Sequence, residues 1–96
     1  MKTLDSIRRH RSEIGKISAR YGIDRLRVFG SLIRDEATDA SDVDFLVKVD
    51  PRRNLLDLVE FSQELSHILQ CKVDVVSEDG VSPYLKDQIF NEAVFL

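Results

Sequence analysis

Apolar residues recur every three or four positions in three stretches of the chain, which is the spacing of an amphipathic helix. These stretches predict helices over residues 3–21, 55–70 and 83–96. Shorter apolar or alternating segments lie between them and predict strands over residues 26–29, 42–49 and 72–76. A further short helix is expected at residues 32–37. This alternation is typical of a small mixed β-sheet flanked by helices, an α/β (α+β) fold.

The boundaries of these helices carry residues that start or end helices. Thr3 and Asn54 have side-chain oxygens that can accept a hydrogen bond from the first turn, so we expect them to be N-caps. Ser82-Pro83 resembles an N-cap followed by proline at the first helical position. Gly22 is placed to end the first helix in a left-handed conformation.

The segment 42–49 alternates between two sets of side chains that face opposite sides of the sheet, namely Val43, Phe45, Val47 and Val49 against Asp42, Asp44, Leu46 and Lys48. Asp42 and Asp44 are therefore expected on one face. Asp74 lies in the middle of the next predicted strand.

Composition limits the class of protein. The 96 residues are 43% hydrophobic and 32% charged, enough for one ordinary core, so we expect a single domain over residues 1–96. The one cysteine, Cys71, excludes an internal disulfide and fits a reducing compartment. The chain begins without the apolar stretch of a signal peptide and contains no run of about 18 apolar residues. We therefore expect a cytoplasmic protein that does not enter membranes.

The charge is unevenly distributed, although its net value is only −3. Residues 1–27 hold eight basic and three acidic side chains, and the remainder holds six basic and fourteen acidic ones. The basic segment is either a face for phosphates or an acidic partner, or an ordinary solvated helix face. Because the whole chain is acidic and few aromatic residues lie among the basic ones, we expect no direct binding of nucleic acid.

One motif indicates chemistry: Gly30-Ser31, ten residues, then Asp42-Val43-Asp44. Gly30 allows a sharp turn and close approach of a ligand, and Ser31 is expected to begin a helix whose free N–H groups attract phosphate. Two carboxylates on one strand face can bind Mg²⁺ shared with substrate phosphates. If Asp74 joins them, the three acids could hold two ions roughly 4 Å apart, and Asp74 could accept a proton. The alternative is a set of acids that only face solvent.

The motif resembles the signature of the minimal nucleotidyltransferases, the small MNT branch of the DNA polymerase beta superfamily. The similarity extends over nearly the whole chain from Leu26. Residues 41–47 resemble the second catalytic strand of that family, residues 73–76 its third acidic strand, and residues 83–96 its closing helix.

The resemblance implies a nucleotidyltransferase fold that binds Mg²⁺, with two ions expected, and ATP as the donor substrate. By position, Gly30, Ser31 and Arg34 would bind the triphosphate. The resemblance also implies roles for three acidic residues as metal ligands and catalytic groups: Asp42, Asp44 and Asp74.

One departure is Asp35, which stands where the family often has glycine. Aspartate tolerates a left-handed turn better than most residues but adds negative charge near the expected phosphates.

Some members of this family act as antitoxins that transfer AMP from ATP to a tyrosine of a HEPN-domain ribonuclease toxin encoded by the adjacent gene. The resemblance implies the same activity here. Two alternatives remain open: a catalytically inactive antitoxin that covers its toxin, and nucleotidyl transfer to a small-molecule or nucleic-acid hydroxyl. Apolar residues spread around the segment 83–96 indicate an interface in a hetero-oligomer or a homodimer. We assign Tyr21 and Tyr84 to packing.

Overall fold

The computed structural model describes residues 2–38 and 40–96. Within these residues the strands form one mixed sheet in the order β3-β2-β1-β4. Their bounds are β1 Ile23–Phe29, β2 Val43–Val49, β3 Val73–Ser77 and β4 Val94–Phe95. Strand β1 is antiparallel to both β2 and β4, whereas β3 is parallel to β2. The expected mixed sheet flanked by helices is confirmed.

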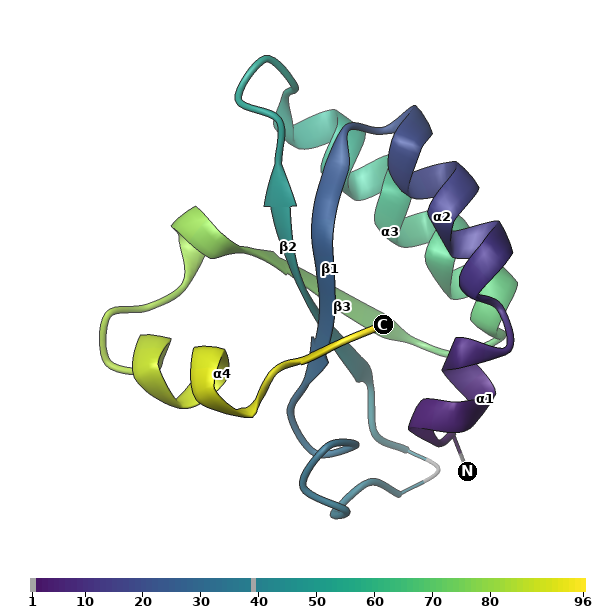
Figure 1. Cartoon of the computed structure of the whole chain (residues 1–96), viewed down its shortest axis with the longest axis vertical. Coiled ribbons are helices and arrows are strands. Elements are labelled where there is room, and N and C mark those ends of the chain that lie inside the picture. The colour runs from purple at the N-terminus through teal and green to yellow at the C-terminus, as the bar shows by residue number, and fades with distance from the viewer. Residues whose placement is uncertain (1, 39) are drawn as a thin grey trace.

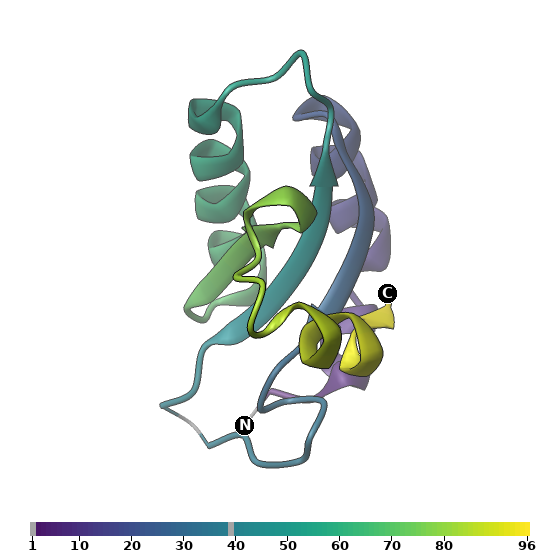
Figure 2. The ribbon, with the colours of Figure 1, turned by 90° about the vertical axis from the view of Figure 1, so that its left-hand side faces the viewer.

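Helices cover the two faces of this sheet unequally. Their bounds are α1 Leu4–Arg8, α2 Arg11–Arg20, α3 Leu55–Leu69 and α4 Lys86–Glu92, with a short 3₁₀ helix η1 at Glu78–Gly80. Helices α1, α2 and α3 lie on one face, and α4 lies on the other (Figure 1). Figure 2 shows α4 and η1 in front of the sheet, with α2 behind it.

The hydrophobic core lies between the sheet and helices α1 to α3. Its strand residues include Val28, Val43, Phe45 and Val47, and its helix residues include Ile7, Ile14, Phe61, Leu65 and Leu69. The alternation of β2 is confirmed, because its odd-numbered residues from Val43 to Val47 face this core. Leu46, on the other face, is also fully buried. The middle of the face opposite the core is therefore covered by other parts of the protein, and this face is not an open polar surface.

The expected helix caps are largely confirmed. Thr3 and Asn54 each accept a hydrogen bond from the first turn and complete a capping box. Gly22 has a φ of +68°, the left-handed conformation expected after the first helix. Tyr21 packs edge-on against the ring of Phe61.

The predicted first helix, residues 3–21, is wrong in one respect: it is two helices. The amide of His10 donates to Ile7, three residues back, which closes α1 before α2 begins at Arg11. The residues at the break carry no apolar side chain that packing could hold in a continuous helix.

The predicted helix at residues 32–37 is also wrong. The segment is a turn closed by bonds from the amides of Ile33 and Arg34 to the carbonyl of Gly30. It ends at Asp35, whose φ of +59° is left-handed. A residue in that conformation cannot continue a right-handed helix.

The predicted last helix, residues 83–96, is shorter than expected at both ends. Ser82 accepts a bond from Leu85 in a turn, and α4 begins only at Lys86. After Glu92 the chain extends as β4 and pairs with β1, which supplies the hydrogen bonds that a helix would have made internally. Tyr84, assigned to packing, is 97% exposed, so that assignment was wrong.

Strand β1 begins three residues earlier than expected. The register of β1 with β2 shifts between Asp24 and Arg27, and Arg25 lies there at a φ of +50°. This irregularity is a β-bulge, which interrupts the alternation that the sequence would otherwise have displayed.

Buried Arg27 connects the carboxyl-terminal segment to the sheet. Its side chain pairs with Glu78, and its guanidinium lies 5.0 Å from the ring centre of Phe90 and 5.1 Å from that of Phe95. Such cation–π contacts strengthen when water is excluded. Arg27 therefore holds η1 and α4 against one face of the sheet and contacts the edge strand β4.

In the described part of the chain, no helix is both long enough and apolar enough to cross a membrane.

We expect Arg27→Ala to lower the free energy of unfolding by about 2–4 kcal/mol, because it removes a buried charge partner and the packing between two rings. Arg25→Ala is the matched control: half-exposed Arg25 approaches the same Glu78 at 3.6 Å. The control should cost under about 1 kcal/mol. Urea denaturation measures both, and equal losses would contradict the role given to Arg27.

Candidate active site

The parallel pairing of β2 and β3 brings two carboxylates side by side. Asp44 is in register with Asp74, and Phe29 of β1 is in register with Asp44 on its other side. Because residues in register on neighbouring strands point to the same face, Asp44 and Asp74 project from the face that α4 covers. This face is opposite to the hydrophobic core.

A cavity of about 340 Å³ opens over this pair. It lies between the strand ends, the turn after β1, the segment after η1, and α4. Its lining comprises Phe29, Gly30, Arg34, Asp44, Asp74, Val76, Gly80, Val81, Ser82, Leu85, Gln88, Ile89 and Glu92. The lining combines three acidic side chains and one arginine with apolar side chains, which is the composition of a pocket that could take a charged group joined to an apolar or aromatic one.

Gly30 leaves β1 at a position where no side chain fits. Its φ is +83°, and a Cβ at this position would collide with the carboxylate of Asp44. Glycine is therefore required at this position for two reasons: the left-handed backbone conformation and the close approach of Asp44.

Glu92, the last residue of α4, contacts this turn. One carboxylate oxygen accepts a hydrogen bond from the Gly30 amide at 2.5 Å, and both oxygens lie 3.0–3.1 Å from one terminal nitrogen of Arg34. Arg34 also donates from Nε to Glu36. Hydrogen bonds to Glu92, and secondarily to Glu36, raise the pKa of the Arg34 guanidinium above its ordinary value.

The half-buried Asp44 carboxylate is the most strongly perturbed acid of the site. Burial, followed by repulsion from Asp74 and then from Asp42, raises its pKa from 3.8 to about 6. Arg34 opposes this shift only in part. A cation beside these carboxylates would remove part of the repulsion.

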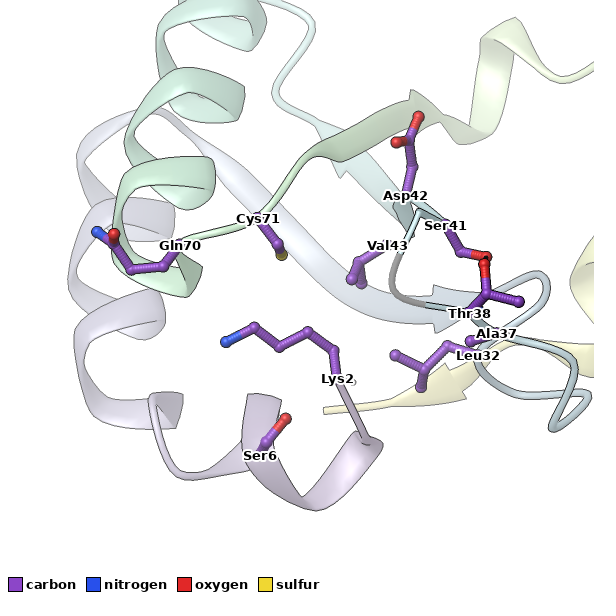
Figure 3. A pocket seen from close by; sticks show the side chains of 10 residues that line it. All are labelled: Lys2, Ser6, Leu32, Ala37, Thr38, Ser41, Asp42, Val43, Gln70 and Cys71. Carbon is purple, nitrogen blue, oxygen red and sulfur yellow. Dashed lines mark hydrogen bonds between the residues drawn. The ribbon is translucent and has the colours of Figure 1, made fainter.

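Asp42 does not line the cavity over Asp44 and Asp74. It is exposed, directly before β2, and belongs to the lining of a second cavity of about 310 Å³. Figure 3 shows its carboxylate turned away from Lys2 and Ser6 in that cavity. Its charge still reaches Asp44, whose pKa it raises.

The donor set fits a hard divalent cation such as Mg²⁺. Asp44 and Asp74 are adjacent carboxylates, the preferred ligands of that ion, and Asp42 is near enough to influence them electrostatically. Among residues 2–38 and 40–96, however, no three acidic, histidine or cysteine side chains are already gathered at ligand spacing. The side chains would therefore need to converge when an ion binds.

The structure brings together four of the six residues that the sequence singled out: Gly30, Arg34, Asp44 and Asp74 all line the larger cavity. Ser31 follows Gly30 in the turn but is not part of that lining, and the helix expected to begin at Ser31 does not form. Sequence reasoning missed Glu92, because it lies 62 residues from Gly30 and carries no motif.

Comparisons with known proteins identify the family of this chain. A family model described as a nucleotidyltransferase domain matches residues 7–96. A proposed protein adenylyltransferase of Methanocaldococcus jannaschii is 42% identical over 78 residues, which cover 81% of this chain and 84% of that protein. Protein adenylyltransferase MntA of Thermococcus cleftensis is 31% identical over 87 residues, covering 91% of this chain and 85% of that protein.

Solved structures agree in fold. One, described as a proposed minimal nucleotidyltransferase, is 40% identical with a TM-score of 0.86, covering 99% of this chain and 97% of the other. A second is an AMPylated Shewanella oneidensis HEPN toxin in complex with an MNT antitoxin. Its TM-score is 0.68 at 20% identity, covering 93% of this chain and 70% of that one, a likeness of fold.

The family model, the relatives and the 40% identical structure confirm the resemblance carried by the Gly30-Ser31 and Asp42-Val43-Asp44 motif. The chain therefore belongs to the nucleotidyltransferase domain family and is a nucleotidyltransferase of the minimal type.

Proposed function

We propose that this nucleotidyltransferase transfers AMP from ATP, in the presence of Mg²⁺, to a tyrosine hydroxyl of a partner HEPN ribonuclease toxin, and so acts as its antitoxin. The observation that carries the proposal is the Asp44–Asp74 pair facing a cavity beside the Gly30 amide and Arg34. Relatives named as protein adenylyltransferases and a structural neighbour that is an antitoxin bound to an AMPylated toxin support the protein acceptor.

In the proposed reaction, the hydroxyl oxygen attacks the α-phosphorus of ATP, the bond to the bridging oxygen of the β-phosphate breaks, and pyrophosphate leaves. Asp44 and Asp74, joined by Asp42, would hold Mg²⁺. The ion would neutralise charge on the phosphates and on the leaving group. The Gly30 amide and Arg34 would orient the triphosphate. Asp74, the exposed member of the pair, would accept the proton of the attacking hydroxyl.

The acceptor is expected to come from a second protein because exposed apolar and aromatic side chains lie at and beside the cavity. Leu85 lines the cavity and is 50% exposed, and neighbouring Tyr84 is 97% exposed. Apolar side chains exposed beside a polar site are typical of surfaces that bind another protein. The gene adjacent to the one encoding this chain is the first place to seek that partner.

The same exposed side chains favour a second candidate function, in which the protein neutralises its toxin by covering it and transfers nothing. Phe95, 55% exposed, adds apolar surface on the same face of the sheet. The two candidates differ in one observable, because a covering protein needs neither nucleotide nor Asp44.

We predict that the chain, mixed with the product of the adjacent gene, Mg²⁺ and each nucleoside triphosphate in turn, adds AMP to that product only with ATP. Intact-mass spectrometry of both chains measures this. Asp42→Asn/Asp44→Asn should reduce the transfer rate at least about a hundredfold, because it removes two carboxylates expected to bind the ion.

The matched control is Asp50→Asn, at the opposite end of β2, where the carboxylate pairs with Arg52 outside the cavity. This variant should transfer at the wild-type rate. A stable complex that neutralises the toxin without any mass gain would favour covering over catalysis. A gain only on a small molecule or a nucleic acid would place the acceptor in another chemical class.

The raised pKa of Asp44 predicts how stability varies with pH in the presence of a chelator. Its folded-state pKa, about 6, exceeds the ordinary 3.8, so the stability that protonated Asp44 contributes is complete below about pH 4 and lost as pH rises through 6. Asp44→Asn should therefore be more stable than the wild type at pH 7–8 and equal to it near pH 4.

Because solvent screens this half-buried carboxylate, we expect a gain of about 1 kcal/mol, or roughly 4–8 °C in melting temperature. Thermal melts followed by circular dichroism from pH 4 to 8 measure the difference. A difference independent of pH would contradict the assigned cause. Adding Mg²⁺ at pH 7.5 should narrow the gap, since the ion stabilises only the wild type.

A further inference from the structure

The carboxylate of Glu92 occupies both hydrogen-bond donors that the proposed nucleotide site offers to phosphate. It accepts from the Gly30 amide at 2.5 Å and from Arg34 at 3.0–3.1 Å. The Glu92 side chain is only 15% exposed, so it lies within the site. One carboxylate oxygen accepts from both the amide and the guanidinium, and the other accepts from the guanidinium alone, which are contacts that phosphate oxygens could also make.

Apart from its contacts with the Gly30 amide and Arg34, the Glu92 carboxylate has other acidic side chains beside it, which disfavour its charge. Its charge helps to raise the pKa of Asp44, and Asp74 lines the same cavity. A third carboxylate beside two others is tolerated because Arg34 and the Gly30 amide compensate it. When a triphosphate binds to those donors, Glu92 loses its partners and faces additional negative charge.

The chain segment around Glu92 limits how the Glu92 carboxylate can move away when a triphosphate binds. Glu92 ends α4, and β4 pairs with β1 two residues later. Buried Arg27 of β1 contacts the rings of Phe90 and Phe95. The backbone on both sides of Glu92 is therefore attached to the sheet. Rotation of the Glu92 side chain is the change that frees the donors with the least disturbance of this packing.

We propose that Glu92 is an internal substitute for phosphate that occupies the nucleotide site of the free enzyme and is displaced by the triphosphate. The proposal rests on the proposed nucleotide site at Gly30 and Arg34. In the free protein Glu92 holds the turn after β1 in its binding conformation, and its displacement lowers the affinity for nucleotide. Glu92 thereby sets nucleotide affinity without taking part in the chemical step.

Glu92→Gln tests this directly, since glutamine keeps the shape of the side chain and removes its charge. A neutral amide oxygen accepts weaker hydrogen bonds than a carboxylate does, so in this variant the Gly30 amide and Arg34 become easier to free. We expect Mg²⁺·AMP-PNP to bind about tenfold more tightly to this variant than to the wild type, measured by isothermal titration calorimetry. The nucleotide-free variant should melt at a lower temperature, because it loses charge-assisted bonds.

Glu36→Gln is the matched control. Glu36 also pairs with Arg34, at 3.2 Å, but it is well exposed and does not line the cavity. This variant should change the affinity less than about twofold, because the interaction of an exposed pair is weak.

A measurement on the wild type avoids dependence on the stability of a variant. With glutamate side chains labelled at the carboxyl carbon, titration of Mg²⁺·AMP-PNP should shift the Glu92 carboxyl resonance and the Gly30 amide resonance together. A Gly30 shift without a Glu92 shift would overturn the proposal.

The outcomes separate this proposal from the function it rests on. If the wild type binds AMP-PNP and Glu92→Gln binds it equally or more weakly, the role of Glu92 is wrong and the nucleotide site stands. If neither protein binds AMP-PNP at millimolar concentration, both proposals fail. If only the variant binds, both are supported.

Discussion

The parallel pairing that sets Asp44 beside Asp74 is the constraint on which the candidate site depends. Parallel pairing of β2 with β3 places the two acids in register on one face of the sheet, where burial and mutual repulsion raise the pKa of Asp44 to about 6. A sheet that must hold these charges together needs its stability from elsewhere. That stability comes from the opposite face, where three helices cover the apolar side chains of the same strands.

The two faces of the sheet have different roles: one packs the hydrophobic core and the other carries the candidate site. On the core face, Val43, Phe45 and Val47 are essentially inaccessible to water. On the other face, Arg27 and its aromatic neighbours hold α4 and β4 in place, and this positions Glu92 over the turn at Gly30. The candidate site is thus assembled from segments far apart in sequence, each attached to the sheet by packing outside the site itself.

The sequence predicted local features well, because local rules determine them. The alternation along β2, the caps at Thr3 and Asn54, and the left-handed Gly22 all follow from neighbouring residues alone. It failed where distant contacts decide the conformation. Phe95 belongs to a strand because β1 offers it hydrogen-bond partners, and the helix expected after Gly30 is a turn that ends at left-handed Asp35. Glu92 could not be found from sequence, since only the fold brings it to Gly30.

We propose that Asp44 and Asp74 bind a divalent ion beside Gly30 when nucleotide is present. Paramagnetic Mn²⁺ in place of Mg²⁺, added with AMP-PNP to the ¹⁵N-labelled protein, tests the position of that ion directly, because it broadens nearby amide resonances. We expect the resonances of Gly30, Asp44 and Asp74 to disappear, while those of Gly22 and Asp50 at the far end of the sheet persist. Uniform broadening, or broadening centred on any other part of the chain, would contradict it.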